Sequence, residues 1–97
     1  MKRLPEPSET IILRQIRSFL QWHGWFVIRI QQGLGCHKGI SDLIAVKNGR
    51  TVFIEVKKPN GKLSDYQERF KATIEDRRGE YVVMRSVEDA KTFCWEV

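Results

Sequence analysis

Asp42, Glu55 and Lys57 are the residues whose side-chain types and spacing could do chemistry together. An Asn-Gly pair at 48–49 separates Asp42 from Glu55 and lies between two runs of strand-forming residues, which is the strongest short-range signal for a β-hairpin. A two-residue turn at 48–49 places Asp42 directly opposite Glu55. Facing residues share one side of a sheet, with Cβ atoms about 4.5–5.5 Å apart. The sequence therefore predicts a close pair of carboxylates.

Two carboxylates at that separation repel each other unless a cation lies between them, and hard divalent cations such as Mg²⁺ prefer oxygen ligands. Lys57 follows Glu55 by two residues and points to the same face. A register slip of one residue would put the acids on opposite faces, so the hypothesis depends on the turn. The structural alternative is a solvent-facing ion pair between Glu55 and Lys57, with Asp42 merely starting a strand.

Glu9 is a third acid that helical spacing brings to the same region. It precedes Ile12 by three residues and Ile16 by seven, which puts it on the apolar face of the first predicted helix. A helix packed on the sheet could aim Glu9 at the carboxylate pair. The alternative is an acid that is favourable only because of the helix dipole.

The elements that must position these residues follow from periodicity, capping and turn signals. We expect helices over 7–22 and 64–78, strands over 25–30, 42–47, 50–57 and 81–85, and a short helix after Ser86. Pro7 is predicted at the first helical position, and Ser64 with Gln67 forms a capping box. Tyr66, Phe70 and Ile74 are predicted to form the apolar stripe of the second helix. The order αβββαβ plus a short C-terminal helix predicts a mixed α/β fold, in a single domain over 1–97.

Composition narrows the class of protein. The 97 residues carry a formal net charge of +5, all of it in the first half of the chain, which favours a polyanionic partner such as nucleic acid. The apolar runs are too short to cross a bilayer, so no membrane association is expected. Two cysteines without metal-binding spacing favour a reducing compartment, and we expect a cytoplasmic protein of a bacterium or a phage-infected cell.

Three sequence blocks together resemble a known family: GISDLI at 39–44, FIEVK at 53–57 and LSDYQ at 63–67. Asp42, twelve intervening residues and then Glu55-Val56-Lys57 are similar to the D…E-x-K signature of the PD-(D/E)XK nucleases. The three blocks in this order resemble more narrowly the VRR-NUC family, which includes small stand-alone phage and bacterial proteins. Ser41 stands where the superfamily's nominal proline would precede the aspartate.

The resemblance implies a role for each matching residue. Asp42 and Glu55 would hold Mg²⁺ or Mn²⁺ together with the carbonyl of Val56, and Glu9 would be an outer acid of the metal site. Lys57 would position the attacking water and offset charge on the phosphate. Gln67 would support the site from the second helix, in addition to capping it.

A second set of residues is predicted to bind the DNA backbone, because they are basic, lie on loops or strand ends and flank the predicted site. Arg29, His37, Lys38, Lys47, Arg50, Lys58 and Lys62 make up this set. The glycines of the 31–39 loop lack the spacing of a phosphate-binding loop.

The sequence therefore predicts a metal-dependent DNA endonuclease, structure-selective for branched DNA such as four-way junctions or flaps, in replication, repair or recombination. A homodimer is expected, because resolving a two-fold symmetric junction needs two sites, and some aromatic residues at element ends exceed what a small core buries. Those residues are Trp22, Trp25, Phe93 and Trp95. The alternatives are a non-catalytic DNA-binding domain with a degenerate nuclease fold, and a small toxin or regulatory protein that binds another protein.

Overall fold

The computed structural model describes residues 7–95 as three helices and a four-stranded sheet. In chain order the elements are α1 (Glu9–Trp22), β1 (Phe26–Arg29), β2 (Leu43–Lys47), β3 (Arg50–Val56), α2 (Asp65–Asp76), β4 (Glu80–Met84) and α3 (Val87–Trp95). The predicted order of elements and the mixed α/β class are confirmed.

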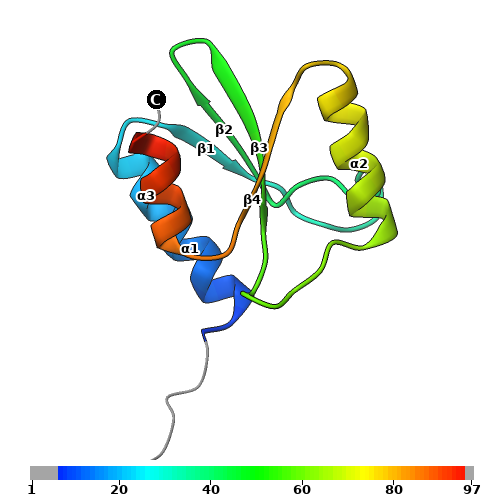
Figure 1. Cartoon of the computed structure of the whole chain (residues 1–97), viewed down its shortest axis with the longest axis horizontal. Helices are drawn as coiled ribbons and strands as arrows, with labels where there is room; N and C mark the ends of the chain where they lie inside the picture. Colours follow the sequence, from blue (N-terminus) through cyan, green and yellow to red (C-terminus); the bar gives the residue numbers. More distant parts are fainter. Residues whose placement is uncertain (1–6, 96–97) are drawn as a thin grey trace, which may run out of the picture.

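The strands lie in the order β1-β2-β3-β4, so β1 and β4 are the two edges. β1, β2 and β3 are antiparallel neighbours, and β4 runs parallel to β3. A parallel pair needs a crossover connection, and α2 supplies it. The helices divide between the two faces of the sheet, with α1 and α3 on one and α2 on the other (Figure 1).

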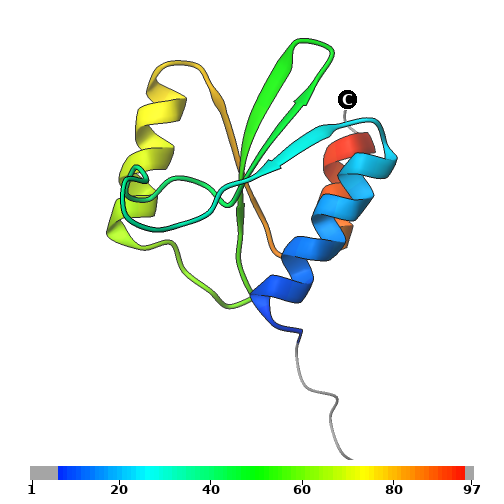
Figure 2. The ribbon, with the colours of Figure 1, turned by 180° about the vertical axis from the view of Figure 1, so that it is seen from behind.

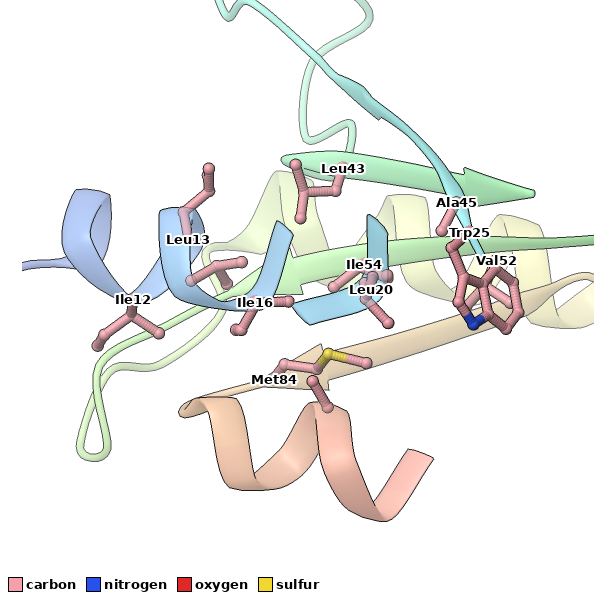
Figure 3. Packing of buried hydrophobic residues seen from close by; sticks show 12 residues of the cluster. Ile12, Leu13, Ile16, Leu20, Trp25, Leu43, Ala45, Val52, Ile54 and Met84 are labelled. Carbon is pink, nitrogen blue, oxygen red and sulfur yellow. The ribbon is translucent and has the colours of Figure 1, made fainter. Parts of the chain in front are cut away.

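The core lies between the sheet and the α1–α3 pair (Figure 3). Apolar residues at helical spacing in α1 meet alternate residues of β2 and β3, because successive strand residues point to opposite faces. Ile16, Leu20, Leu43 and Ile54 are fully buried there. The opposite set of β3 residues, which includes Glu55, faces the α2 side of the sheet.

The hairpin turn has the predicted geometry. Asn48 and Gly49 both adopt positive φ values, 51° and 80°, as the two central residues of a type I′ turn require. The ladder pairs Lys47 with Arg50 and continues to Leu43 opposite Ile54. The next step along this register puts Asp42 opposite Glu55, so the predicted register is confirmed.

Two expectations about single residues of the helices are wrong. The first helix begins at Glu9 and not at Pro7: Ser8 is its N-cap, because its side chain accepts a hydrogen bond from the Ile11 N–H, so Pro7 lies outside the helix. Tyr66 is 49% exposed instead of joining the apolar stripe of α2, because the first turn of α2 extends beyond the aromatic cluster around Phe70.

The aromatic residues at element ends are divided between core and surface. Trp25 is buried, and its ring lies 5.4 Å from that of the partly buried Phe93, so these two belong to the core. Trp22 and Trp95 are 88% and 92% exposed. No helix in the stretch 7–95 is both long and apolar enough to cross a membrane.

Candidate active site

Asp42 is anchored from two sides just before β2 begins. Its backbone carbonyl accepts a hydrogen bond of 2.8 Å from the Ile30 N–H, which extends the β1–β2 ladder by one residue. Its carboxylate oxygen Oδ2 accepts a hydrogen bond of 2.8 Å from the Val56 N–H. The carboxylate is therefore fixed against the end of β3, beside Glu55.

Glu55 is a buried acid, with only 2% of its surface exposed. Its Oε1 accepts a hydrogen bond of 2.7 Å from the amide nitrogen of Gln67 and lies 3.9 Å from the ammonium of Lys57. Its other oxygen, Oε2, is buried and receives no hydrogen bond from any residue in the described range. The solvent-facing ion pair considered from the sequence is therefore wrong, because Glu55 is inside the protein.

The surroundings of Glu55 favour its neutral form. The pKa of the Glu55 carboxyl is raised to about 8, mainly by burial and next by the negative charge of Asp42, whose effect is larger than the lowering by Lys57. A carboxyl that is expensive to ionise and has an unsatisfied oxygen is unusual in a purely structural role. Its charge would be compensated by a cation at Oε2.

The backbone carbonyl of Val56 adds a third oxygen-bearing group to the carboxylates of Asp42 and Glu55. The Lys57 N–H donates to the Met84 carbonyl, on the β4 side of β3. Backbone groups of consecutive strand residues point to opposite edges, so the N–H and carbonyl of Val56 point to the β2 side. The bond from the Val56 N–H to Asp42 agrees with this direction. The Val56 carbonyl is therefore directed to the same side of β3 as the Asp42 carboxylate.

Lys57 lies on the same face as Glu55, and its side chain is 14% exposed. It is followed by the 58–61 turn, which Arg85 holds in place: the Arg85 guanidinium donates to the carbonyls of Lys58, Pro59 and Gly61. Arg85 was not expected here, because no local sequence pattern marks a residue that binds three distant carbonyls.

Gln67 connects α2 to the acid pair. Its side-chain oxygen accepts from the Ser64 N–H at 2.8 Å, and its N–H donates to the Ser64 hydroxyl at 3.2 Å, which completes the predicted capping box. Its amide nitrogen remains free to donate to Glu55. One side chain thus fixes the start of α2 and the orientation of the buried carboxyl.

Gly39 brings the segment between β1 and β2 against the start of α2 (Figure 2). Its φ is +81°, and a Cβ there would collide with the Tyr66 carbonyl and lie 2.9 Å from the Gln67 nitrogen. Only glycine allows both the conformation and the approach. Gly39 belongs to one of the three sequence blocks, but no role was expected for it.

Glu9 lies at the first turn of α1 and is exposed. Its charge also raises the pKa of Glu55, although it is the smallest of the contributions. Across residues 7–95, no group of three or more His, Cys, Asp and Glu side chains is arranged to hold a metal ion. The structure therefore brings Asp42 and Glu55 together and leaves Glu9 at the periphery.

Three of the predicted DNA-binding residues line hollows next to these acids. Arg29 borders a hollow of about 420 Å³ that also contains Asp42. His37 and Lys38 border a hollow of about 370 Å³ that also contains Gln67. Lys58 is exposed at the turn after β3, and Lys62 is exposed shortly after it.

Lys47 and Arg50 do not lie near the acid pair, so their expected position beside the site is wrong, whereas their binding to DNA stays a prediction. They flank the turn at the far end of the hairpin, five residues and roughly 17 Å along the strands from Asp42 and Glu55. The Lys47 ammonium donates to the His23 carbonyl at 2.8 Å. Arg50 makes two hydrogen bonds to Glu80, which lower the pKa of the Glu80 carboxyl.

The oxygen groups around Asp42 and Glu55 suit a small divalent cation. Two facing carboxylates, one of which has an oxygen that receives no hydrogen bond, and a backbone carbonyl on the same side are hard ligands of the type that Mg²⁺ and Mn²⁺ prefer. Soft sulfur ligands are absent from this set. The residues therefore fit the group that the sequence resemblance implies.

The structure is that of a small α/β protein with a candidate active site at two facing carboxylates. A family model, the VRR-NUC domain, matches residues 7–88. A solved structure described as a VRR_NUC domain has the same fold, with a TM-score of 0.78 and 22% identity over 89% of this chain and 92% of that chain. No curated protein matches the sequence.

The chain belongs to the VRR-NUC domain family, because the family model covers most of its length. The resemblance that was inferred from the three sequence blocks is confirmed. Membership gives the chain a nuclease-type, DNA-related function.

Proposed function

We propose that this protein is a Mg²⁺- or Mn²⁺-dependent DNA endonuclease. The observation that carries the proposal is the buried Glu55 carboxyl, which faces Asp42 and has one oxygen without a hydrogen-bond donor. A folded protein tolerates a buried, repelling acid pair where a cation compensates it. Family membership supports the same conclusion independently.

Asp42, Glu55 and the Val56 carbonyl would hold the cation, which when bound polarises a phosphoryl oxygen and lowers the pKa of water. Gln67 keeps the Glu55 carboxyl in one orientation through its 2.7 Å hydrogen bond. The Lys57 ammonium, next to Glu55, offsets negative charge on the phosphate and orients the attacking water. Glu9 would be an outer acid that adds negative charge to the region.

The proposed substrate is branched DNA, such as four-way junctions or flaps. Residues 7–95 form the sheet, its three helices and their connections, without an additional module that would read bases in a groove. Contacts from Arg29, Lys38, Lys58 and Lys62 would go to phosphates, which fix position without sequence information. A role in replication, repair or recombination follows from such a substrate.

We also propose a homodimer that uses the open face and edge of β1. Phe26 and Ile28 are 66% and 40% exposed, and they pair across the sheet with Val46 and Ile44. This apolar strip lies on the α2 side of the sheet, whereas α2 packs against β3 and β4. Two copies of an open edge strand can pair about a two-fold axis.

Because Cys36 and Cys94 are both free thiols, we propose a reducing compartment, the cytoplasm.

A cleavage assay tests the catalytic proposal. Supercoiled plasmid and labelled duplex, flap and four-way-junction DNA are incubated with Mg²⁺, Mn²⁺, Ca²⁺ or EDTA. We expect cleavage only with Mg²⁺ or Mn²⁺, faster on branched DNA, and at least about a 100-fold lower rate for Asp42→Asn.

Glu75→Gln is the matched control, since it also removes one acidic charge but from the exposed side of α2. It should cut at the wild-type rate. DNA binding without cleavage under all conditions would instead identify a non-catalytic DNA-binding domain, and full cleavage by Asp42→Asn would contradict the site.

A further inference from the structure

Tyr66 presents an exposed aromatic ring one residue away from Gln67, which holds the buried acid. The ring is 49% exposed, although it lies on a helix whose other large aromatic residue, Phe70, is buried. Neither the predicted apolar stripe of α2 nor the proposed chemistry accounts for it.

Two cations lie close to this ring. The Lys38 ammonium lies 5.0 Å from the ring centroid and the Arg69 guanidinium lies 5.7 Å from it. The ion pairs found in residues 7–95 use Arg50, Lys57 and Lys91, so neither Lys38 nor Arg69 is neutralised by an acid there. An exposed ring with two such cations close to it combines the elements that bind single-stranded nucleic acid: the ring stacks a base and the cations contact phosphates.

The surface is hollowed next to the ring. A hollow of about 370 Å³ includes Gly39, Ser64 and Gln67 in its lining, and a second of about 450 Å³ includes Arg69 and Phe70. Tyr66, His37 and Lys38 line both. Each hollow is within the size range of small-molecule sites, about 300–1,000 Å³, and therefore has room for a planar base.

The position of Tyr66 is fixed by the packing already described. Gly39 approaches the Tyr66 backbone so closely that the 31–40 segment is held against the first turn of α2. This contact positions the Lys38 ammonium over the Tyr66 ring. The arrangement of Tyr66 and Lys38 therefore depends on packing between two segments of the chain and not on one exposed side chain alone.

We propose that Tyr66, with Lys38 and Arg69, forms a subsite for one unpaired nucleotide next to the cleavage site. A base inside a continuous duplex cannot stack on a protein ring without leaving its own stack. The substrate class is therefore DNA with an unpaired nucleotide close to the cut phosphate, as at a flap or a strand end near a junction. This inference rests on the proposed nuclease function for its biological meaning, but its test does not.

Binding in EDTA tests the subsite without any cleavage. Fluorescence anisotropy measures the affinity of a short single strand and of a matched blunt duplex. We expect Tyr66→Leu to weaken binding of the single strand by about 5- to 100-fold, the usual range for one stacked base. Binding of the duplex should change by less than about two-fold.

Two control variants separate the ring from other effects. Tyr66→Phe keeps the aromatic face and should bind both DNAs like the wild type. Trp95→Leu removes another exposed aromatic ring, on α3 at the opposite face of the sheet, and should also bind like the wild type (Figure 1). Equal losses on single strand and duplex, or the same loss for Tyr66→Phe as for Tyr66→Leu, would overturn the proposal.

A change in the DNA provides a second measurement that leaves the protein intact. Abasic nucleotides are placed one at a time along the unpaired arm of a flap. One position should weaken binding to the wild type and leave binding to Tyr66→Leu unchanged, because the stacking partner is already missing. Identical abasic effects in both proteins would contradict the subsite.

The two proposals can fail separately. If plasmid and branched DNA stay uncut in Mg²⁺ but Tyr66→Leu loses single-strand binding, the subsite stands and the nuclease activity fails. If cleavage occurs and the Tyr66 variants bind like the wild type, the nuclease stands and the subsite fails.

Discussion

The burial of Glu55 has two opposing effects. It fixes the orientation of the carboxyl, but it also makes the charged form of that carboxyl unfavourable. Its raised pKa, about 8, means that the folded protein favours the neutral acid. The free energy of unfolding therefore includes a favourable contribution that is complete below the unfolded pKa, near 4.5. This contribution is lost as the pH rises through about 8.

We expect Glu55→Gln to stabilise the metal-free protein at pH 8 while it abolishes cleavage. The amide of the variant keeps an oxygen that accepts the hydrogen bond from Gln67. Its nitrogen is a donor and takes the place of Oε2, which has no hydrogen-bond partner and lies next to Asp42. Removing an uncompensated buried charge is worth about 1–3 kcal/mol. Thermal melts in EDTA from pH 5 to pH 8 should show a falling melting temperature for the wild type and a flatter profile for the variant.

Added Mg²⁺ provides the control for this interpretation. A cation that binds the ionised pair should raise the melting temperature of the wild type more at pH 8 than at pH 6, because protons compete with it at lower pH. It should have little effect on Glu55→Gln. A variant that is less stable than the wild type at pH 8 would show that the charge of Glu55 is already compensated in the metal-free protein.

Lys57 is expected to serve the reaction more than the fold. Its ammonium is 3.9 Å from Glu55, at the long end of an ion-pair contact, and the raised pKa of Glu55, about 8, leaves that partner mostly neutral near pH 7, so the pair adds little stability. Lys57→Ala should lower the single-turnover cleavage rate by about 10²- to 10³-fold, with DNA affinity close to that of the wild type. Lys91→Ala, which removes the exposed Lys91–Glu88 pair, is the matched control and should cut normally. A Lys57→Ala protein that unfolds, and whose folded fraction cuts normally, would make Lys57 structural.

At the scale of elements, the contact between the 31–40 segment and α2 determines whether the site is complete. Gly39→Ala combines an unfavourable positive φ with a collision against the Tyr66 carbonyl. We expect it to destabilise the protein by more than about 2 kcal/mol and to lower cleavage, because α2 and Gln67 must shift. Urea unfolding and the junction assay measure the two effects.

Gly35→Ala is the matched control, since Gly35 also has a positive φ, +88°, but open space around its Cβ position. It should show only the left-handed backbone penalty, about 1–2 kcal/mol, with normal cleavage by the folded protein. Equal losses of activity in both variants would contradict a specific role for the Gly39 contact.

The elements that sequence predicted best are those with local determinants. The Asn48-Gly49 turn restricts its own backbone, and the alternation of apolar residues then fixes which face each acid occupies. The capping box of Ser64 and Gln67 is local in the same way. These signals sufficed to place Asp42 opposite Glu55.

What sequence did not predict depends on distant partners. The burial of Glu55 follows from its contact with Gln67 on α2, and the 58–61 turn depends on Arg85 from beyond β4. Arg50 was expected at the DNA but is paired with Glu80, thirty residues later in the chain. Side-chain charge alone does not distinguish such a residue from a free cation.

At the scale of the whole molecule, the proposed chemistry and the proposed interface lie on the same side of the sheet. Asp42 and Glu55 face the α2 side, and so do Phe26 and Ile28, because Val27 between them packs against the core. The core face is already covered by α1 and α3 (Figure 2). The uncovered part of the α2 side is thus where a second copy could both bury apolar surface and bring in a second site.

We expect the protein to be a dimer at micromolar concentration, with twice the monomer mass in sedimentation equilibrium. Phe26→Lys with Ile28→Lys should give a monomer that stays folded, because both side chains are exposed in the single chain. Trp95→Lys also introduces a charge at an exposed aromatic position, but on α3, and should remain a dimer. A wild-type protein at monomer mass, with and without DNA, would contradict the dimer.

The dimer also has a mechanistic consequence. A single site cuts one strand per binding event, whereas a two-fold symmetric junction needs two matched cuts. Mixing the wild type with inactive Asp42→Asn should therefore give mixed dimers that nick a four-way junction without resolving it. Resolution should fall with the square of the active fraction, whereas nicking should fall linearly. If resolution instead falls linearly, each chain resolves junctions by two independent cuts, and the β1 face has some other use.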